Sequence, residues 1–169
     1  GMPNGTRAFA VSGNGNVIAG SIVGNPIESA SVRIGNALVQ DLGIVPGHHS
    51  SRALAVSGDG TIVVGQNMAG SGTNYTSGQA FMWTAQTGMQ PMPHLRAGGS
   101  LTQARGISRD GTTVVGMSQF GGTGGPIEAF SWTQSGGMVP LPALPGGSFS
   151  GLYPNPASPD GSVIFRAAA

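Results

Sequence analysis

A short motif returns four times along the 169-residue chain. Its two clearest copies, Ser57-Gly-Asp-Gly and Ser108-Arg-Asp-Gly, are flanked by apolar stretches, while Ser12 begins a Gly-Asn-Gly copy and Ser158 a weaker Pro-Asp-Gly copy. Successive serines are 45, 51 and 50 residues apart (12 to 57, 57 to 108, 108 to 158). A period of about 40–50 residues is typical of the four-stranded blades of a β-propeller.

Each repeat can be divided into strands. Asn-Gly or Asp-Gly between two apolar stretches predicts a tight β-hairpin with a type I′ turn. The first and second strands of each repeat should therefore be joined by turns at residues 13–15, 58–60, 109–111 and 159–161.

Aromatic residues mark the third strand of two repeats. Phe81 and Trp83 lie two positions apart in residues 79–84, as do Phe130 and Trp132 in residues 128–133, so each pair shares one face of its strand. A platform for stacking sugars is one interpretation, but recurrence in successive blades favours packing between neighbouring sheets. In the first repeat, the third strand is expected at residues 28–33, with Ala30 and Val32 replacing the aromatics.

The fourth strand is expected at residues 89–95 and 138–144. Prolines recur in both segments, and proline is tolerated mainly in edge strands, which places this strand at the outer edge of the blade. We predict one all-β repeat domain over residues 1–169, a propeller-like array of four-stranded antiparallel blades. The expected blades are residues 6–47, 51–98 and 101–147, with half a blade at 152–166.

Composition excludes several other classes. With 31 glycines, 12 prolines and only 8% charged residues, the chain is neither a helical bundle nor a coiled coil. The seven arginines are scattered, so no basic patch for nucleic acid is visible. Cysteine is absent, which excludes disulfides and thiolate sites, and no apolar run reaches the roughly 18 residues of a membrane helix. No signal peptide is recognisable.

The repeat resembles a known family. Ser-x-Asp-Gly, the Val-Val-Gly strand, Glu-Ala-Phe-x-Trp-Thr, Gly-Gly-Met-Val and Leu-Pro-Gly-Gly are similar to the motifs of the bacterial extracellular HAF repeats, best over residues 104–147 and then 53–98. The resemblance implies a secreted or cell-surface location and a structural repeat, and it supplies no functional residues.

Several candidate sites have a structural interpretation that we favour. Asp59, Asp110 and Asp160 each sit alone in a turn, where asparagine substitutes at position 14, so turn geometry explains them better than metal binding. His48, His49 and His94 show no ligand spacing for a metal. Glu28 and Glu128 should occupy equivalent places in separate blades, too far apart to act as a catalytic pair. We therefore predict no catalytic residues, no metal and no cofactor.

Ligand-binding candidates lie on one face of the predicted propeller. Loops between the second and third strands, at residues 23–27, 67–78 and 118–126, should share that face with the connections between blades. Arg7 and Arg52 are equivalent, and they should line the mouth of the central channel with Gln103 and Tyr153, where arginines can bind anions. The candidates are Asn74, Tyr75, Phe120, His48, Arg7 and Arg52.

These features predict a non-enzymatic binding or spacer module that is secreted or displayed on the cell surface. A carbohydrate or a protein is the expected ligand, without nucleic acid or membrane insertion. The alternatives are a sialidase-like enzyme that acts on glycans and a purely structural passenger repeat. An open array of blades exposes two apolar ends, so we also expect self-association through those ends, as a homodimer.

Overall fold

The computed structural model describes residues 5–24, 27–71, 74–122, 124–142, 150–157 and 164–168. For residues 71, 74–76, 150–157 and 164–168 only the backbone is described. Throughout these ranges the chain forms strands and turns, so the all-β prediction is confirmed. None of the described residues forms a helix that could span a membrane.

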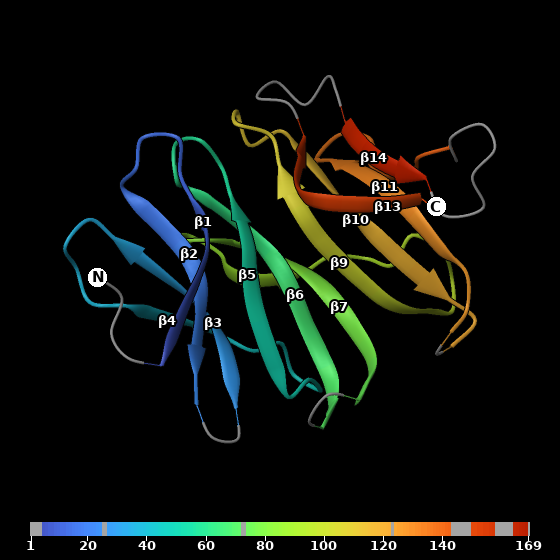
Figure 1. Cartoon of the computed structure of the whole chain (residues 1–169), viewed down its shortest axis with the longest axis horizontal. Helices are drawn as coiled ribbons and strands as arrows, with labels where there is room; N and C mark the ends of the chain where they lie inside the picture. The colour runs from blue at the N-terminus through green and yellow to red at the C-terminus, as the bar shows by residue number, and fades with distance from the viewer. Residues whose placement is uncertain are drawn as a thin grey trace.

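Three four-stranded units follow one another along the chain (Figure 1). Unit 1 contains β1 (Thr6–Val11), β2 (Val17–Val23), β3 (Glu28–Ile34) and β4 (Gln40–Gly43). Unit 2 contains β5 (Ser50–Val56), β6 (Ile62–Ser71), β7 (Asn74–Thr84) and β8 (Gly88–Pro91). Unit 3 contains β9 (Gly99–Ile107), β10 (Thr113–Phe120), β11 (Ile127–Thr133) and β12 (Gly137–Pro140).

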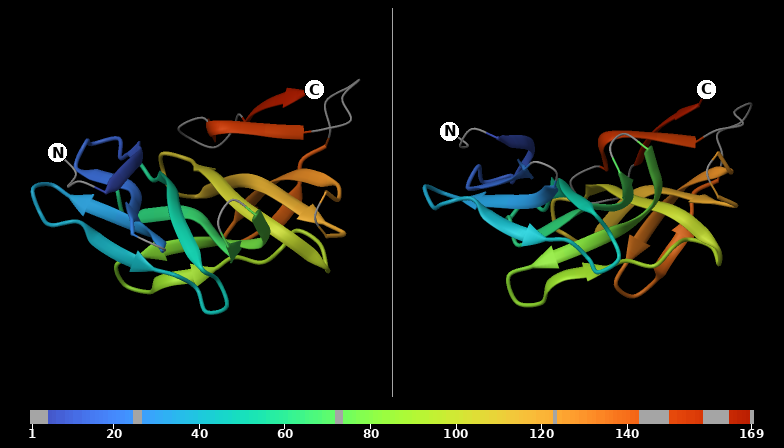
Figure 2. Two further views of the ribbon diagram at one scale, coloured as in Figure 1. Left: turned by 60° about the horizontal axis from the view of Figure 1, so that its bottom comes forward. Right: turned by 90° about the horizontal axis from the view of Figure 1, so that it is seen from below.

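Within each unit, strands pair antiparallel in chain order, from the first strand to the fourth. Units 2 and 3 are joined by one parallel pairing, between Gly78 of β7 and Leu101 of β9. A fourth, two-stranded sheet of β13 (Ser150–Ala157) and β14 (Ile164–Ala168) lies against unit 3, beside β9, β10 and β11 (Figure 2). The described sheets do not close into a ring (Figure 1).

The serine motif builds the hairpin turns predicted at residues 13–15, 58–60 and 109–111, whereas 159–161 lies outside the described residues. In unit 2 the Ser57 hydroxyl donates to Asp59 Oδ1 (2.6 Å) and accepts from the Ile62 amide (3.0 Å). Ser57 N also donates to Ile62 O (2.9 Å), so the loop is longer than the predicted two-residue type I′ turn. The glycine of Asp-Gly has a positive φ, which is 82° at Gly60.

A β-bulge recurs at the same place in the first strand of every unit. The pairing with the second strand skips one residue: Phe9 in β1, Leu54 in β5 and Arg105 in β9. Opposite each bulge lies a glycine, Gly20, Gly65 or Gly116, whose added Cβ would overlap the carbonyl oxygen of Arg7, Arg52 or Gln103 respectively. The bulge therefore explains the glycine that ends each Val-Val-Gly motif.

The core lies between the units, as the aromatic pattern predicted. Phe81 is fully buried and Trp83 is 6% exposed, and both pack from unit 2 against small side chains of unit 1. Trp132 packs from unit 3 against unit 2 in the same way, and Phe130 is fully buried. The interpretation of these residues as core is confirmed.

The register of β3 corrects the prediction for unit 1. Gly20 pairs with Ser31, whereas the equivalent Gly65 and Gly116 pair with Phe81 and Phe130. Ser31 and Arg33 therefore replace the aromatics, and Ala30 and Val32 lie on the opposite face, in the core shared with unit 2. The prediction failed because shifting a strand by one residue exchanges its two faces.

The same register separates two glutamates that the sequence aligned. Ser118 pairs with Glu128, and the equivalent residue of unit 1, Ile22, pairs with Ser29. Ser29 is thus the counterpart of Glu128, and the prediction that Glu28 is equivalent to Glu128 is wrong by one position.

Two strand boundaries also differ from expectation. The predicted loop at residues 67–78 is largely strand, because β6 and β7 stay paired to their ends at Ser71 and Asn74. The predicted fourth strands are shorter, ending at Pro91 and Pro140, since prolines interrupt the donors that a ladder needs.

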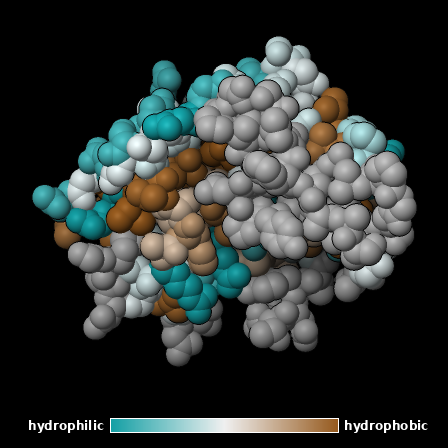
Figure 3. Space-filling model, turned by 45° about the horizontal axis from the view of Figure 1, so that its top comes forward, coloured by the Kyte–Doolittle hydropathy of each residue, from teal (hydrophilic) through white to brown (hydrophobic). Residues whose placement is uncertain are grey.

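Exposed apolar side chains gather in unit 1. Among the described residues, seven large hydrophobic side chains are exposed, and all but Val139 belong to unit 1: Phe9, Val11, Val23, Ile27, Ile34 and Leu38. An apolar patch is visible on the side of the molecule where unit 1 lies (Figure 3). Self-association through this end of the array stays a prediction.

Candidate functional site

Two opposite ends of the units carry the polar residues of interest. The rim is the end that holds the connections between units, residues 44–49 and 92–98, and the β6–β7 and β10–β11 hairpin tips. The turn face is the end that holds the Asp-Gly turns. Strand register places the predicted ligand-binding residues towards the rim, because Arg7 pairs with Ser21, Arg52 with Gln66, and Phe120 with Gly99.

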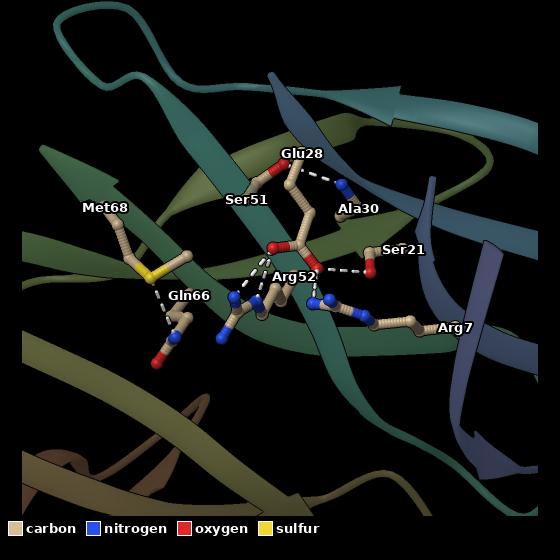
Figure 4. A network of polar contacts seen from close by, with 8 residues as sticks. All are labelled: Arg7, Ser21, Glu28, Ala30, Ser51, Arg52, Gln66 and Met68. Atoms are coloured by element: carbon tan, nitrogen blue, oxygen red, sulfur yellow. Dashed lines mark hydrogen bonds and ion pairs between the residues drawn. The ribbon is translucent and has the colours of Figure 1, made fainter. Parts of the chain in front are cut away.

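The carboxylate of Glu28 binds two arginines at the rim, Arg7 of unit 1 and Arg52 of unit 2 (Figure 4). Its Oε2 accepts from Arg52 Nε (2.9 Å) and Nη2 (2.7 Å), and its Oε1 accepts from Arg7 Nη1 (3.2 Å) and Ser21 Oγ (2.6 Å). The sequence predicted that Arg7 and Arg52 occupy equivalent positions, but it did not predict that both would bind the same carboxylate. Part of their charge is therefore neutralised within the protein.

The Glu28 ion cluster should contribute stability that depends on pH. Burial alone raises the pKa of Glu28, but hydrogen bonds from Arg52 and Ser21 and the charges of both arginines outweigh it and lower the pKa below the ordinary 4.5. A lowered folded-state pKa stabilises above the unfolded pKa, and this contribution is lost as the pH falls through the folded pKa.

We therefore expect Glu28→Gln to lower the free energy of unfolding at neutral pH by about 1 kcal/mol, since the Arg7 side chain is 52% exposed. Urea unfolding at a series of pH values should show this difference shrinking below pH 4.5. Glu128→Gln, which breaks a more exposed pair, should have a smaller effect. If the difference in the free energy of unfolding between the native chain and Glu28→Gln stayed constant with pH, a lowered pKa of Glu28 would be contradicted.

Glu128 forms a second ion pair at the rim. Arg96 donates from Nε to Oε2 (2.6 Å) and from Nη2 to Oε1 (2.8 Å), a bidentate geometry. The guanidinium also lies 5.5 Å from the centre of the Phe120 ring. Phe120, a predicted ligand residue, thus packs with Arg96 at the end of β10.

The connections between units bring two histidines near each other. Burial, followed by the charge of His48, lowers the pKa of His94, whose Nδ1 lies 2.6 Å from Thr102 Oγ1. His48 Nδ1 is buried and lacks a hydrogen-bond partner among the described residues. The sequence missed this proximity because the two histidines belong to different connections.

Two predicted ligand residues can be placed only by their backbone. Asn74 and Tyr75 begin β7 and pair with Ser71 and Gly70. Their side chains lie outside the described part of the structure. Within that part, no three histidine, aspartate or glutamate side chains come together as metal ligands would.

The turn face carries two equivalent grooves between successive units. Groove 1–2, about 520 Å³, lies between units 1 and 2 and is lined by Asn16, Val17, Ile34, Asp59, Gly60, Thr61, Ile62, Trp83, Thr84, Ala85 and Gln86. Groove 2–3, about 590 Å³, lies between units 2 and 3 and is lined by Ile62, Met82, Asp110, Gly111, Thr112, Trp132, Thr133, Gln134 and Ser135. Each combines an Asp-Gly-Thr turn, a tryptophan and a turn between third and fourth strands.

The chemistry of the two grooves is also alike. Each has an apolar wall of tryptophan and aliphatic side chains, a polar edge of hydroxyls and amides, and one aspartate among its lining residues. Hydrogen bonds from Ser57 and from the Thr61 backbone lower the pKa of Asp59, so this carboxylate is ionised at neutral pH. These tryptophans and aspartates were predicted to have structural roles, and the grooves they line arise only where two units meet.

Four-stranded antiparallel units that pack face to face in chain order are arranged like the blades of a β-propeller. The solved structures to which the chain is similar include two TolB structures. TolB from Acinetobacter baumannii matches with a TM-score of 0.57 and 17% identity over 89% of this chain and 36% of that one. A putative TolB from Agrobacterium tumefaciens matches with a TM-score of 0.64 and 14% identity over 99% and 60%.

The chain thus spans less than two thirds of the length of either TolB structure. At these identities the likeness shows the fold alone. No family model and no curated protein matches the chain.

Proposed function

We propose that this chain is a non-enzymatic binding module of a secreted or cell-surface protein, built from propeller blades, and that it binds neutral carbohydrate in grooves 1–2 and 2–3. The observation that carries the proposal is the repetition of the groove. Equivalent residues of successive units line both grooves, on the same face of the molecule.

The residues of the grooves favour a neutral sugar over other ligands. A pyranose has an apolar face of C–H groups and an edge of hydroxyls, and the grooves offer an apolar wall beside carboxylate, hydroxyl and amide groups. The lining residues of each groove include one aspartate and no arginine, which disfavours phosphates, sugar acids and nucleic acid as ligands. Two sites on one face also suit polymeric ligands, because the second binding event becomes intramolecular.

The sialidase-like alternative has less support. The glutamates at the rim, Glu28 and Glu128, are engaged by arginines, which keeps them ionised and unsuited to act as a general acid. Turnover of aryl glycosides would favour the enzyme.

Stoichiometry tests the proposal. A glycan array identifies a neutral oligosaccharide, and titration calorimetry then measures how many bind. Gln86 and Gln134 are exposed at the two grooves, so Gln86→Trp should block groove 1–2 and Gln134→Trp groove 2–3. We expect two sites in the native chain, one in each variant and none in the double variant.

Gln90→Trp is the matched control, because Gln90 is also exposed but lines neither groove. It should bind like the native chain. Binding that survives both blocks, or that is lost with Phe120→Ala at the rim, would refute the grooves as the site. An array without any bound glycan would favour the structural passenger repeat.

A further inference from the structure

Arg105 is a half-buried cation that binds no carboxylate of the described residues. Its Nε (3.1 Å) and Nη2 (2.7 Å) both donate to the side-chain oxygen of Gln103, a neutral amide. Burial lowers the pKa of Arg105, and no opposite charge within the described part of the chain offsets this cost. By contrast, Arg7 and Arg52 share Glu28, and Arg96 binds Glu128.

The fold does not require an arginine here. Arg105 is the extra residue of the β-bulge in β9, and the same bulge holds Leu54 in β5 and Phe9 in β1. Leu54 is half-buried like Arg105, so an apolar side chain suits this position and avoids the cost of burying a charge. The guanidinium group is therefore a feature of unit 3 that the bulge itself does not need. Bulges commonly change the direction of a side chain at functional sites.

We propose that Arg105 and Gln103 form a binding site for a carboxylate group of a small organic acid or of a partner molecule. Gln103 occupies only part of the guanidinium fork, and the remaining N–H groups, including those of Nη1, have no partner among the described residues. Carboxylates match this fork with paired hydrogen bonds, as Glu128 does on Arg96 in this same chain. The Gln103 amide N–H₂ is a further donor beside it.

This site is independent of the proposed grooves. It lies on the first strand of unit 3, and Arg105 lines neither groove. It also differs from the Glu28 cluster, where a carboxylate of the protein already occupies the arginines.

Titration calorimetry with succinate, at constant ionic strength set by sodium chloride, tests the site. The whole chain should bind succinate, and Arg105→Leu should bind at least tenfold more weakly. Arg105→Leu reproduces the native residue of unit 2, so it should fold, and it should be as stable as the native chain or more so. Arg33→Gln removes a positive charge elsewhere and should bind like the native chain.

Inorganic phosphate distinguishes a carboxylate site from a general oxyanion site. We expect it to bind more weakly than succinate, and stronger binding of phosphate would overturn the assignment to carboxylates. Equal binding of succinate by the native chain and Arg105→Leu, or none by either, would overturn the site itself. An NMR shift of the Arg105 Nε–H resonance on adding succinate would support direct contact.

Discussion

Replacing Gly65 with alanine is expected to destabilise the protein by about 3 kcal/mol or more, although it adds one methyl group. The Cβ would overlap the carbonyl oxygen of Arg52 and lie 2.8 and 2.9 Å from two ring atoms of Phe81. The oxygen belongs to Arg52, which pairs with Gln66 of β6 next to the bulge of β5, so it cannot move without disturbing that pairing. Chemical unfolding monitored by tryptophan fluorescence measures the loss, and Gly116→Ala should behave alike.

Gly88→Ala is the control for this prediction. Gly88 has a positive φ of 67°, and an added Cβ would meet open space. Alanine there should therefore destabilise the protein only through the strain of a left-handed backbone, by about 1–2 kcal/mol. A smaller loss at Gly65 than at Gly88 would mean that the bulge relaxes more easily than its geometry indicates.

The repeat in the sequence predicted the strand content of the units because its signals are local. Each Asp-Gly turn closes a hairpin through its own serine and aspartate, and each Phe-x-Trp pair faces the neighbouring unit. These features depend on residues within one repeat, so reading the chain alone was enough. The two-residue turn type was wrong because the serine and aspartate side chains hold a longer loop.

Features that depend on strand register could not be predicted from the sequence. In unit 1 no aromatic anchors the third strand, and a shift of one residue placed Ala30 and Val32 on the wrong face and aligned Glu28 with Glu128. The bulges left no sign in the sequence except the glycine opposite each of them.

The candidate sites were predicted unevenly for the same reason. The sequence placed Arg7 and Arg52 in equivalent strands, but their shared partner comes from a third strand, β3. Grooves 1–2 and 2–3 arise where two units meet, so neither repeat contains a whole site. Arg105 could be recognised as a candidate site only from its burial and from its hydrogen bonds to the neutral Gln103, neither of which the sequence reveals.

Phe81→Ala should have the other large effect, a loss of about 3–5 kcal/mol in the free energy of unfolding. Phe81 is fully buried between units 1 and 2, where its ring lies over Gly65. At about 2–4 °C per kcal/mol for a chain of this size, the thermal midpoint should fall by roughly 10 °C. Phe81→Leu, which fills much of the same volume, should cost markedly less, and equal losses would show that the ring is not closely packed.

Combining the two substitutions separates the two contacts of Gly65. If the overlap with the Arg52 carbonyl dominates, Gly65→Ala should cost nearly as much in the Phe81→Ala background as in the native chain, so the losses add. If the ring dominates, the added methyl should partly fill the space left by Phe81, and the double variant should be more stable than the sum predicts. We expect additivity, because the Arg52 carbonyl oxygen, held by the pairing of β5 with β6, remains when the ring is removed.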